Sequence, residues 1–386
     1  MGLSKRERVF RTLELQGEPD KVPIHYFGFE QTGQSFQEFK ESEERKENYG
    51  WVKSNISKIR YYITEPRFWN VDLWGMDPFG EIKIKVRYRD APEEFPGCRL
   101  NIMDGRLYKN VKQINTGLEY SWYVDGYFKT PEILFSYWDK YGKPTELINN
   151  RINYSPQVWE DFVDVLSPYF YPMANLPLNP SEVLIGGITF LRFAYYTRKN
   201  PTFIHTVMDE YTKVNIEIIK RLSEAGVDIV TFGDDLGYKE NQFFSQKVFQ
   251  EFILPYHKRI YETCRKRGIL VVLHSCGKVD PFLPDLVDAG LTCIQSLEAT
   301  AGVDLIGLKK SLGDRLCFMG GLDSSGILTY GTPKEVEENV KNTIKIAGSG
   351  GGYFVGPSHD ILNIPWDNIL AMRTAIEQYR SYPLNF

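Results

Sequence analysis

The ten-residue stretch Gly268–Gly277, GILVVLHSCG, decides how the rest of the chain is interpreted. Its apolar run, Ile269 to Leu273, contains three β-branched residues and predicts a strand that is buried on both faces, as in a parallel sheet. The run ends at His274 and Cys276, which are two residues apart, so both side chains point to the same side of the pleat. An imidazole nitrogen and a thiolate sulfur placed together in this way predict half of a zinc site.

Strand-like and helix-like segments alternate regularly from about residue 180. The expected strands are Val183–Phe190, Val227–Phe232, Ile269–Leu273, Cys293–Ser296, Leu316–Met319 and Tyr353–Val355. The expected helices are Phe203–Ala225, Gln246–Arg267, Phe282–Ala289, Val303–Lys310, Pro333–Ala347 and Pro365–Tyr379. Six βα units in series predict a parallel sheet. A first strand at Lys21–Phe29 and one more upstream would complete an eight-stranded TIM (β/α)8 barrel, with an open doubly wound sheet as the alternative.

The N-terminal half is less regular. Ser4–Gln16 is expected to form a helix that opens with a capping box. Alternating apolar residues in Glu81–Asp90 and strand character in Gly105–Phe128 predict a small antiparallel β insertion, and Pro131–Phe170 predicts a helical excursion. We therefore expect one elaborated α/β barrel domain over residues 1–386, with an insertion at roughly residues 80–175.

The composition limits the classes of partner. A net charge of −4 and an isoelectric point of about 5.9 do not indicate binding to nucleic acid or to an anionic membrane surface. The sequence has no apolar run near the ~20 residues of a membrane span, and its first residues lack the apolar core of a secretory signal. Five scattered cysteines form no disulfide pattern, so we expect a cytoplasmic location. The abundant aromatic residues (24 Tyr, 24 Phe and 7 Trp) fit a pocket for a flat or apolar ligand.

Ionisable residues follow several of the expected strands. In a barrel, functional groups come from the C-terminal ends of the strands. Besides His274 and Cys276, these positions hold Asp234, Asp235, Glu298, Asp323 and His359. A catalytic zinc site has three protein ligands and one open position, and His359 is the best candidate for the third ligand. The alternative is a core cysteine beside a hydrogen-bonded histidine.

The other strand-end acids have several candidate roles. Asp234 and Asp235 are candidate catalytic residues, as a general base, substrate acceptors or metal ligands. In the alternative interpretation, one of them caps the next loop or pairs with Lys239. Glu298 and Asp323 are expected to cap loops or to hold neighbouring site groups.

Substrate contacts are predicted at three positions. The candidate substrate-binding residues are His25, Tyr26 and Glu298. The remaining cysteines and two histidines are expected to pack in the core or lie at the surface; these are Cys98, Cys264, Cys293, Cys317, His205 and His257.

Several stretches resemble the uroporphyrinogen decarboxylase superfamily. They are LHSCGKVDPFLPDLVDAG (273–290), FMGGLDSSGIL (318–328), GPSHDILNIPWDNILAM (356–372) and, near the N-terminus, RTLELQGEPDKVPIHYFG (11–28). The resemblance implies a TIM barrel, in agreement with the count of βα units. Residues 80–175 resemble no family that we can name.

The superfamily includes two chemistries. Its decarboxylases carry an arginine-rich RQAGR stretch after the first strand, whereas this chain reads HYFGFEQTGQ (25–34), without arginine. Its corrinoid-dependent methyltransferases hold zinc with a HxC pair and a later cysteine. His274 and Cys276 match the pair, and His359 stands in place of the later cysteine. Fewer thiolates would leave a more Lewis-acidic zinc.

The resemblance therefore implies a zinc-dependent methyltransferase. An oxygen leaving group suits the histidine-rich ligand set, and the aromatic residues suit a methoxylated aromatic donor, so we expect an O-demethylase component. The sequence has no DxHxxG cobalamin motif, and a separate corrinoid (cobalamin) protein is the expected partner beside a small-molecule methyl donor. A homodimer, transfer from methylcorrinoid to a thiol, a metal-free decarboxylase and a non-catalytic corrinoid- or tetrapyrrole-binding protein stay open as alternatives.

Overall fold

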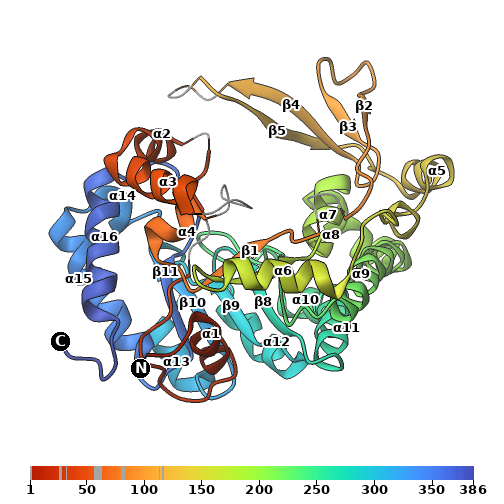
Figure 1. The fold of residues 1–386 in the computed structure, drawn as a ribbon. Helices are drawn as coiled ribbons and strands as arrows, with labels where there is room; N and C mark the ends of the chain where they lie inside the picture. Colours follow the sequence, from red (N-terminus) through yellow and green to blue (C-terminus); the bar gives the residue numbers. More distant parts are fainter. Residues whose placement is uncertain are drawn as a thin grey trace.

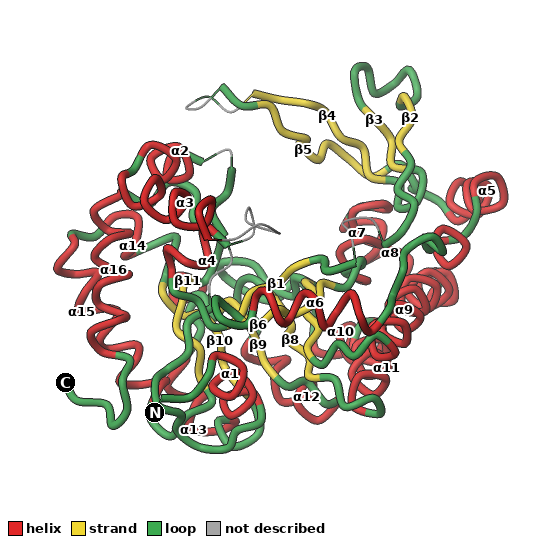
Figure 2. Tube along the Cα trace, in the orientation of Figure 1, coloured by secondary structure: helices red, strands yellow, loops and turns green. Residues whose placement is uncertain are grey.

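Seven parallel strands form the centre of the protein in the computed structural model, which describes residues 2–25, 28–31, 33–55, 63–79, 83–112, 114 and 117–386. The strands lie in the order β1 (Leu73–Met76), β6 (Tyr171–Asn175), β7 (Ile229–Gly233), β8 (Leu270–Ser275), β9 (Cys293–Ser296), β10 (Cys317–Leu322) and β11 (Tyr353–Pro357). Each strand pairs in parallel with its neighbours. Helices surround them, as βαβ connections require (Figures 1 and 2).

A short segment joins the two edge strands. Ile24 forms a parallel bridge with Val355 of β11, and His25 forms one with Leu73 of β1. The His25 amide donates to the Val355 carbonyl at 2.9 Å, and the Asp72 amide donates to the Ile24 carbonyl at 2.8 Å. The barrel prediction is confirmed, but the expected strand Lys21–Phe29 is wrong: isolated bridges replace it among the described residues. Tyr26 lies outside the described residues.

The outer layer consists of helices of very different length. They are α1 (Lys5–Leu13), α2 (Gln34–Glu41), α3 (Glu43–Asn55), α4 (Thr64–Trp69), α5 (Pro131–Tyr141), α6 (Pro156–Leu166), α7 (Pro180–Ile188), α8 (Phe190–Lys199), α9 (Pro201–Glu224), α10 (Gln246–Phe252), α11 (Leu254–Arg265), α12 (Leu283–Ala289), α13 (Leu305–Leu312), α14 (Ile327–Tyr330), α15 (Pro333–Thr343) and α16 (Trp366–Tyr379). The expected helix Gln246–Arg267 is therefore divided at Ile253, just before Pro255, whose ring nitrogen has no hydrogen to donate.

A second strand prediction is also wrong. Residues 183–190 were expected to form a strand, but they lie in α7 and at the start of α8. Pro180 occupies the first turn of α7, where its missing N–H costs nothing, and the carboxylate of Asp234 accepts the next two amides, of Ser181 and Glu182. The strand that the barrel uses instead is β6, which contains Pro172 and therefore carries a weak strand signal.

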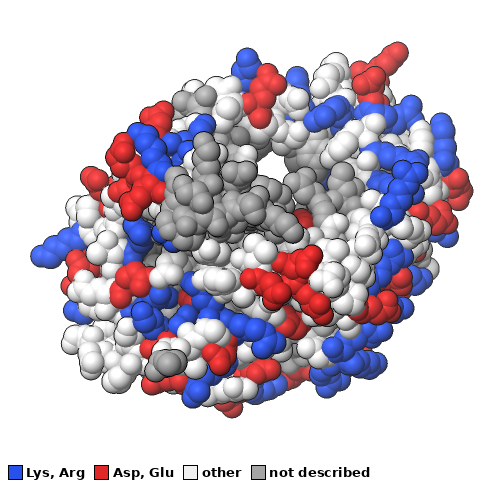
Figure 3. Space-filling model, in the orientation of Figure 1, with Lys and Arg blue, Asp and Glu red and all other residues white. Residues whose placement is uncertain are grey.

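The predicted antiparallel insertion is confirmed. Four strands form the inserted sheet: β2 (Tyr88–Asp90), β3 (Arg99–Asn101), β4 (Arg106–Lys112) and β5 (Glu119–Gly126), each antiparallel to the next. The sheet lies above the barrel on the side of α7, and the space-filling view is hollowed beneath β4 and β5 (Figures 1 and 3). The backbone joins the two parts where the Phe128 amide donates to the Gly187 carbonyl at 2.9 Å.

A buried ion network ties the ends of the chain to the barrel. Asp72 is fully buried and binds Arg8 of α1 at 2.6 Å and Arg380, just after α16, at 3.1 Å. Its second oxygen also accepts the Ile24 amide, at 2.8 Å. The same carboxylate therefore holds the closing segment, the first helix and the C-terminal segment. Within the described residues, none of the helices combines the length and apolar character that a bilayer span requires.

Candidate metal centre and adjoining cavities

Three predicted zinc ligands come together at one end of the barrel. His274 lies in β8, Cys276 follows that strand, and His359 follows β11. The His274 Nε2 atom is 3.0 Å from the Cys276 Sγ atom, and His359 Nδ1 is 3.7 Å from the same sulfur. One ligand atom from each residue lies within 4.8 Å of the other two. This spacing suits donors that surround one small cation.

Each imidazole is held by a hydrogen bond on its far nitrogen. His274 Nδ1 contacts the Gln295 Oε1 atom of β9, and His359 Nε2 contacts a carboxylate oxygen of Glu298. Both partners accept hydrogen bonds, so the far nitrogens carry the hydrogens and the near nitrogens present lone pairs to the centre. Metal-binding histidines are usually oriented in this way. The structure thus places Glu298, a candidate substrate-binding residue, against a candidate ligand.

Burial disfavours charge on these groups. It raises the pKa of the Cys276 thiol above its ordinary range, with further contributions from the Asp235 and Glu298 carboxylates. Burial likewise lowers the pKa of His274, and it lowers the pKa of His25 to about 3, assisted by the charge of His274. The Cys276 thiol and the His274 imidazole therefore favour their neutral forms when no cation is present.

The two neighbouring aspartates have different surroundings. Asp234 is fully buried, caps α7, and contacts His257 Nε2 at 2.7 Å. Asp235 faces the centre: its Oδ1 atom accepts the Cys276 amide at 2.8 Å and lies 3.8 Å from His274 Nε2. Asp235 lines both of the cavities described below, and Asp234 lines neither of them. His257, expected to pack in the core or lie at the surface, is fully buried.

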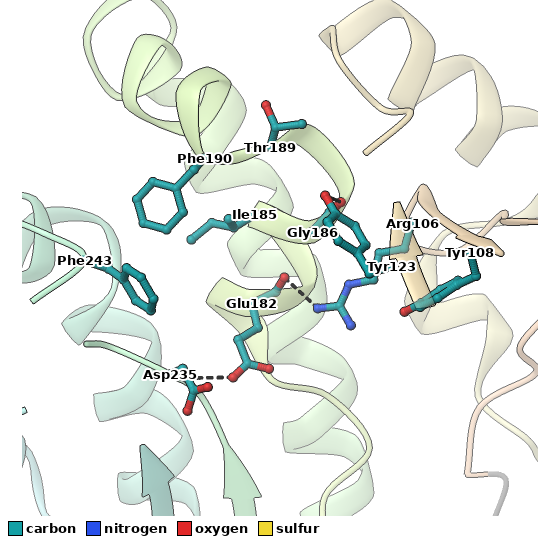
Figure 4. A pocket seen from close by; sticks show the side chains of 10 residues that line it. All are labelled: Arg106, Tyr108, Tyr123, Glu182, Ile185, Gly186, Thr189, Phe190, Asp235 and Phe243. Atoms are coloured by element: carbon teal, nitrogen blue, oxygen red, sulfur yellow. Dashed lines mark hydrogen bonds between the residues drawn. The ribbon is translucent and has the colours of Figure 1, made fainter. Parts of the chain in front are cut away.

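Two cavities adjoin the candidate centre. The barrel cavity, of about 490 Å³, contains His25 and His274, together with Gly75, Met173, Asn175, Leu176, Asn179, Glu182, Thr231, Phe232, Gly233 and Asp235. The aromatic cavity, of about 410 Å³, lies between α7, α8 and the inserted sheet and is lined by Arg106, Tyr108, Tyr123, Glu182, Ile185, Gly186, Thr189, Phe190, Asp235 and Phe243 (Figure 4). Because Glu182 and Asp235 line both cavities, the two spaces meet at these carboxylates.

Glu182 is a site residue that the sequence did not reveal. Its carboxylate accepts the Asp235 amide at 2.7 Å and the Asn179 side-chain amide at 2.8 Å. Burial, together with Asp234 and Asp235, raises the pKa of Glu182 to about 7. Glu182 was overlooked because it immediately precedes the segment misassigned as a strand.

The other overlooked residues are Gln295 and Arg106. A polar residue inside the apolar segment CIQS was a usable signal for Gln295. For Arg106 no signal was available, because the inserted sheet reaches the cavity only through tertiary packing. The predicted loop role of Asp323 fits its position: its Oδ1 atom accepts the Ser325 amide at 3.0 Å and the Thr300 hydroxyl at 3.3 Å.

Comparison with known proteins gives consistent relatives. The chain is 27% identical over 214 residues to the methylcobamide:CoM methyltransferase MtaA of Methanosarcina barkeri, covering 52% of this chain and 60% of that protein. It is 24% identical over 173 residues to a methylated-thiol–coenzyme M methyltransferase of Methanosarcina mazei, covering 45% of this chain and 44% of the relative. It is 28% identical over 200 residues to a uroporphyrinogen decarboxylase of Christiangramia forsetii, covering 50% of this chain and 54% of the relative. The matches thus span about half of each relative's length.

A solved structure agrees with the fold. A methyltransferase from Methanosarcina mazei superposes with a TM-score of 0.59 at 16% identity, covering 98% of this chain and 99% of that one. The family model described as uroporphyrinogen decarboxylase (URO-D) matches residues 181–379. Because this match covers more than half of the chain, the protein belongs to the uroporphyrinogen decarboxylase family.

Proposed function

We propose that the protein is a zinc-dependent methyltransferase that moves a methyl group from an O-methylated aromatic donor to the cobalt(I) of a corrinoid carried by a partner protein. The observation that carries this proposal is the convergence of His274, Cys276 and His359, with His274 lining a barrel cavity that shares Glu182 and Asp235 with the aromatic cavity. Relatives named as methylcobamide and methylated-thiol methyltransferases support the corrinoid and the one-carbon chemistry.

The residues present fit zinc. Two imidazole nitrogens and one sulfur are among its preferred ligands, and three protein ligands leave a fourth position for a substrate. The hydrogen bonds to Gln295 and Glu298 already hold both imidazoles in the tautomers that a metal needs. A calcium or magnesium site would instead consist of oxygen atoms.

Zinc bound there would supply a Lewis acid for the ether oxygen of the donor. The chain's own residues perform the remaining tasks. Methyl transfer breaks the carbon–oxygen bond and leaves the electron pair on the aryl oxygen, which then takes up a proton. Asp235 and Glu182 lie between the two cavities, and Glu182, with its pKa raised to about 7, would exchange this proton near neutral pH.

The aromatic cavity would hold the donor's ring. Ile185, Phe190 and Phe243 form an apolar wall, opposite the two tyrosines of the inserted sheet (Figure 4). Phe190 and Phe243 are themselves in contact, with ring centroids 5.1 Å apart. A flat ring can stack against such a wall, which also keeps water away from the reacting bond.

A second candidate function is methyl transfer from a methylcorrinoid to a thiol. It is favoured by the relatives whose names specify coenzyme M. The two directions need the same zinc ligands but different small substrates. Free cobalamin distinguishes them: cob(I)alamin with methoxybenzene derivatives tests the first direction, and methylcobalamin with a thiol tests the second.

The first test measures the zinc content of the purified protein and compares it with that of three histidine variants. We expect about one zinc per chain, lost in His274→Ala and in His359→Ala but retained in His205→Ala. His205 is a suitable control because it lies in α9, where it contacts the hydroxyl of Tyr256 at 2.9 Å.

Three outcomes would change the proposal. Zinc lost only with His274→Ala would assign the third ligand to a carboxylate such as Glu298. Failure to bind offered zinc would contradict the methyltransferase proposal. Decarboxylation that continues after chelation would favour the metal-free alternative.

A further inference from the structure

Arg106 is the only cation among the described residues that line the aromatic cavity. It begins β4 of the inserted sheet, and its guanidinium extends toward Glu182 of α7, beside Tyr108 and Tyr123 (Figure 4). Its side chain is 23% exposed, so it forms part of the cavity wall and is not a solvated surface group.

The position of the guanidinium is fixed by α7 and by its own strand. Its Nη2 atom donates to the Glu182 carbonyl at 2.7 Å, and its Nε atom is 3.9 Å from an Asp104 carboxylate oxygen. Gly186 provides the space for this arrangement, because a Cβ atom there would lie 2.2 Å from Arg106 Nε. A cation held in place before binding loses little freedom when a ligand arrives.

Two buried carboxylates with raised pKa values, those of Asp104 and Glu182, lie near this cation. Burial raises the pKa of Asp104 to about 6, and burial with the neighbouring aspartates raises the pKa of Glu182 to about 7. Both acids are therefore easier to protonate than exposed ones, while the pKa of Arg106 is raised further, although burial opposes it, chiefly by the charge of Asp104. An anion bound to the guanidinium would favour their neutral forms and replace their charge.

We propose that Arg106 binds an acid group of the small methyl substrate, so that the substrate is an aromatic carboxylate. This inference rests on the proposed function. The planar guanidinium matches a carboxylate, the apolar wall of Phe190 and Phe243 accommodates the ring, and Asp235 marks the end nearest His274, where the methyl group would lie. The inserted sheet thereby determines substrate choice, because it supplies the recognition residue.

The experiment measures binding by titration calorimetry, without corrinoid and without turnover. The ligands are 4-methoxybenzoate and its neutral analogue 4-methoxybenzamide. We expect Arg106→Met to weaken binding of the acid roughly tenfold to a hundredfold and to change binding of the amide by less than about twofold. Arg99→Met is the matched control, since Arg99 lies on the same sheet and contacts Asn110 and Ser121 on its exposed side.

A second variant displaces the guanidinium and retains its charge. Gly186→Ala places a methyl group 2.2 Å from Arg106 Nε, and the three nearest atoms all belong to the flexible Arg106 side chain. It should weaken binding of the acid in the same way and leave the helix intact. Equal losses for the acid and the amide, or an unchanged affinity for the acid in both variants, would overturn the inference.

Binding and methyl transfer separate the two proposals. Arg106-dependent binding of the acid without methyl transfer to cob(I)alamin would support the inference and count against the proposed function. Equal transfer from the acid and the amide, unaffected by Arg106→Met, would overturn the inference and leave the proposed function standing.

Discussion

Glu182 illustrates how burial of one residue couples a site to pH. Its carboxylate lies where the two cavities meet, close to Asp234 and Asp235. Burial first, and then these two charges, raise its pKa from 4.5 to about 7. At a pH between these two values, the folded protein therefore keeps a proton at Glu182 that the unfolded chain has released. Between about pH 4.5 and pH 7, the contribution of Glu182 to the free energy of unfolding falls as the pH rises.

Replacing Glu182 with glutamine should remove this dependence. Glutamine keeps the shape and one acceptor oxygen but cannot ionise. We expect the Tm of Glu182→Gln, relative to that of the natural protein, to be higher at pH 8 than at pH 5. Thermal unfolding at both pH values measures the difference. A difference that does not vary with pH would show that Glu182 has an ordinary pKa.

Packing between α7 and the inserted sheet depends on two adjacent glycines with different surroundings. A Cβ atom at Gly187 would lie 1.9 Å from the backbone carbonyl oxygen of Asp104, whereas the three atoms nearest to one at Gly186 all belong to the Arg106 side chain. A backbone atom cannot move without displacing the loop that leads into β4. The inserted sheet is thus fixed to the barrel at Gly187, and this contact brings Arg106 to the cavity.

The two alanine variants should therefore differ in stability. We expect Gly187→Ala to lower the free energy of unfolding by about 1–3 kcal/mol through overpacking, and Gly186→Ala to leave it within about 0.5 kcal/mol. Urea unfolding of both variants provides the comparison. Similar values for the two would mean that the sheet is not held at this position.

For the whole molecule, closure of the barrel depends on Asp72. This buried carboxylate binds Arg8, Arg380 and the amide of Ile24, and so joins the first helix, the closing segment and the C-terminal segment. Removing its charge would leave two largely buried guanidinium groups without their shared partner. Breaking a buried pair in this way is far more costly than breaking an exposed one.

We expect Asp72→Asn to lower the free energy of unfolding by about 3–5 kcal/mol. Glu377→Gln is the matched control: Glu377 binds Arg380 at 3.1 Å, but its side chain is 37% exposed, so the cost should stay below about 1 kcal/mol. Denaturant unfolding monitors both. A small effect of Asp72→Asn would indicate that the bridges at residues 24 and 25 close the barrel without ionic support.

The sequence by itself determined the parallel barrel and the candidate ligands His274, Cys276 and His359. Buried strands are marked by local apolar runs, and barrel strands carry functional residues at their C-terminal ends, so both signals are local. The sequence did not determine which of the two adjacent aspartates faces the cavity, because the direction of each side chain depends on how the chain turns after β7. In the structure, Asp234 lies under α7 and Asp235 lies beside Cys276.

Only the tertiary structure brought Glu182 and Arg106 to the site. They are 76 residues apart and come from different layers, one from a helix beside the barrel and one from the inserted sheet. Their proximity results from close packing of backbone at Gly187, a contact between distant segments that no local pattern encodes. The sequence therefore determined the barrel and its candidate metal ligands, whereas long-range packing decided which side chains surround the substrate.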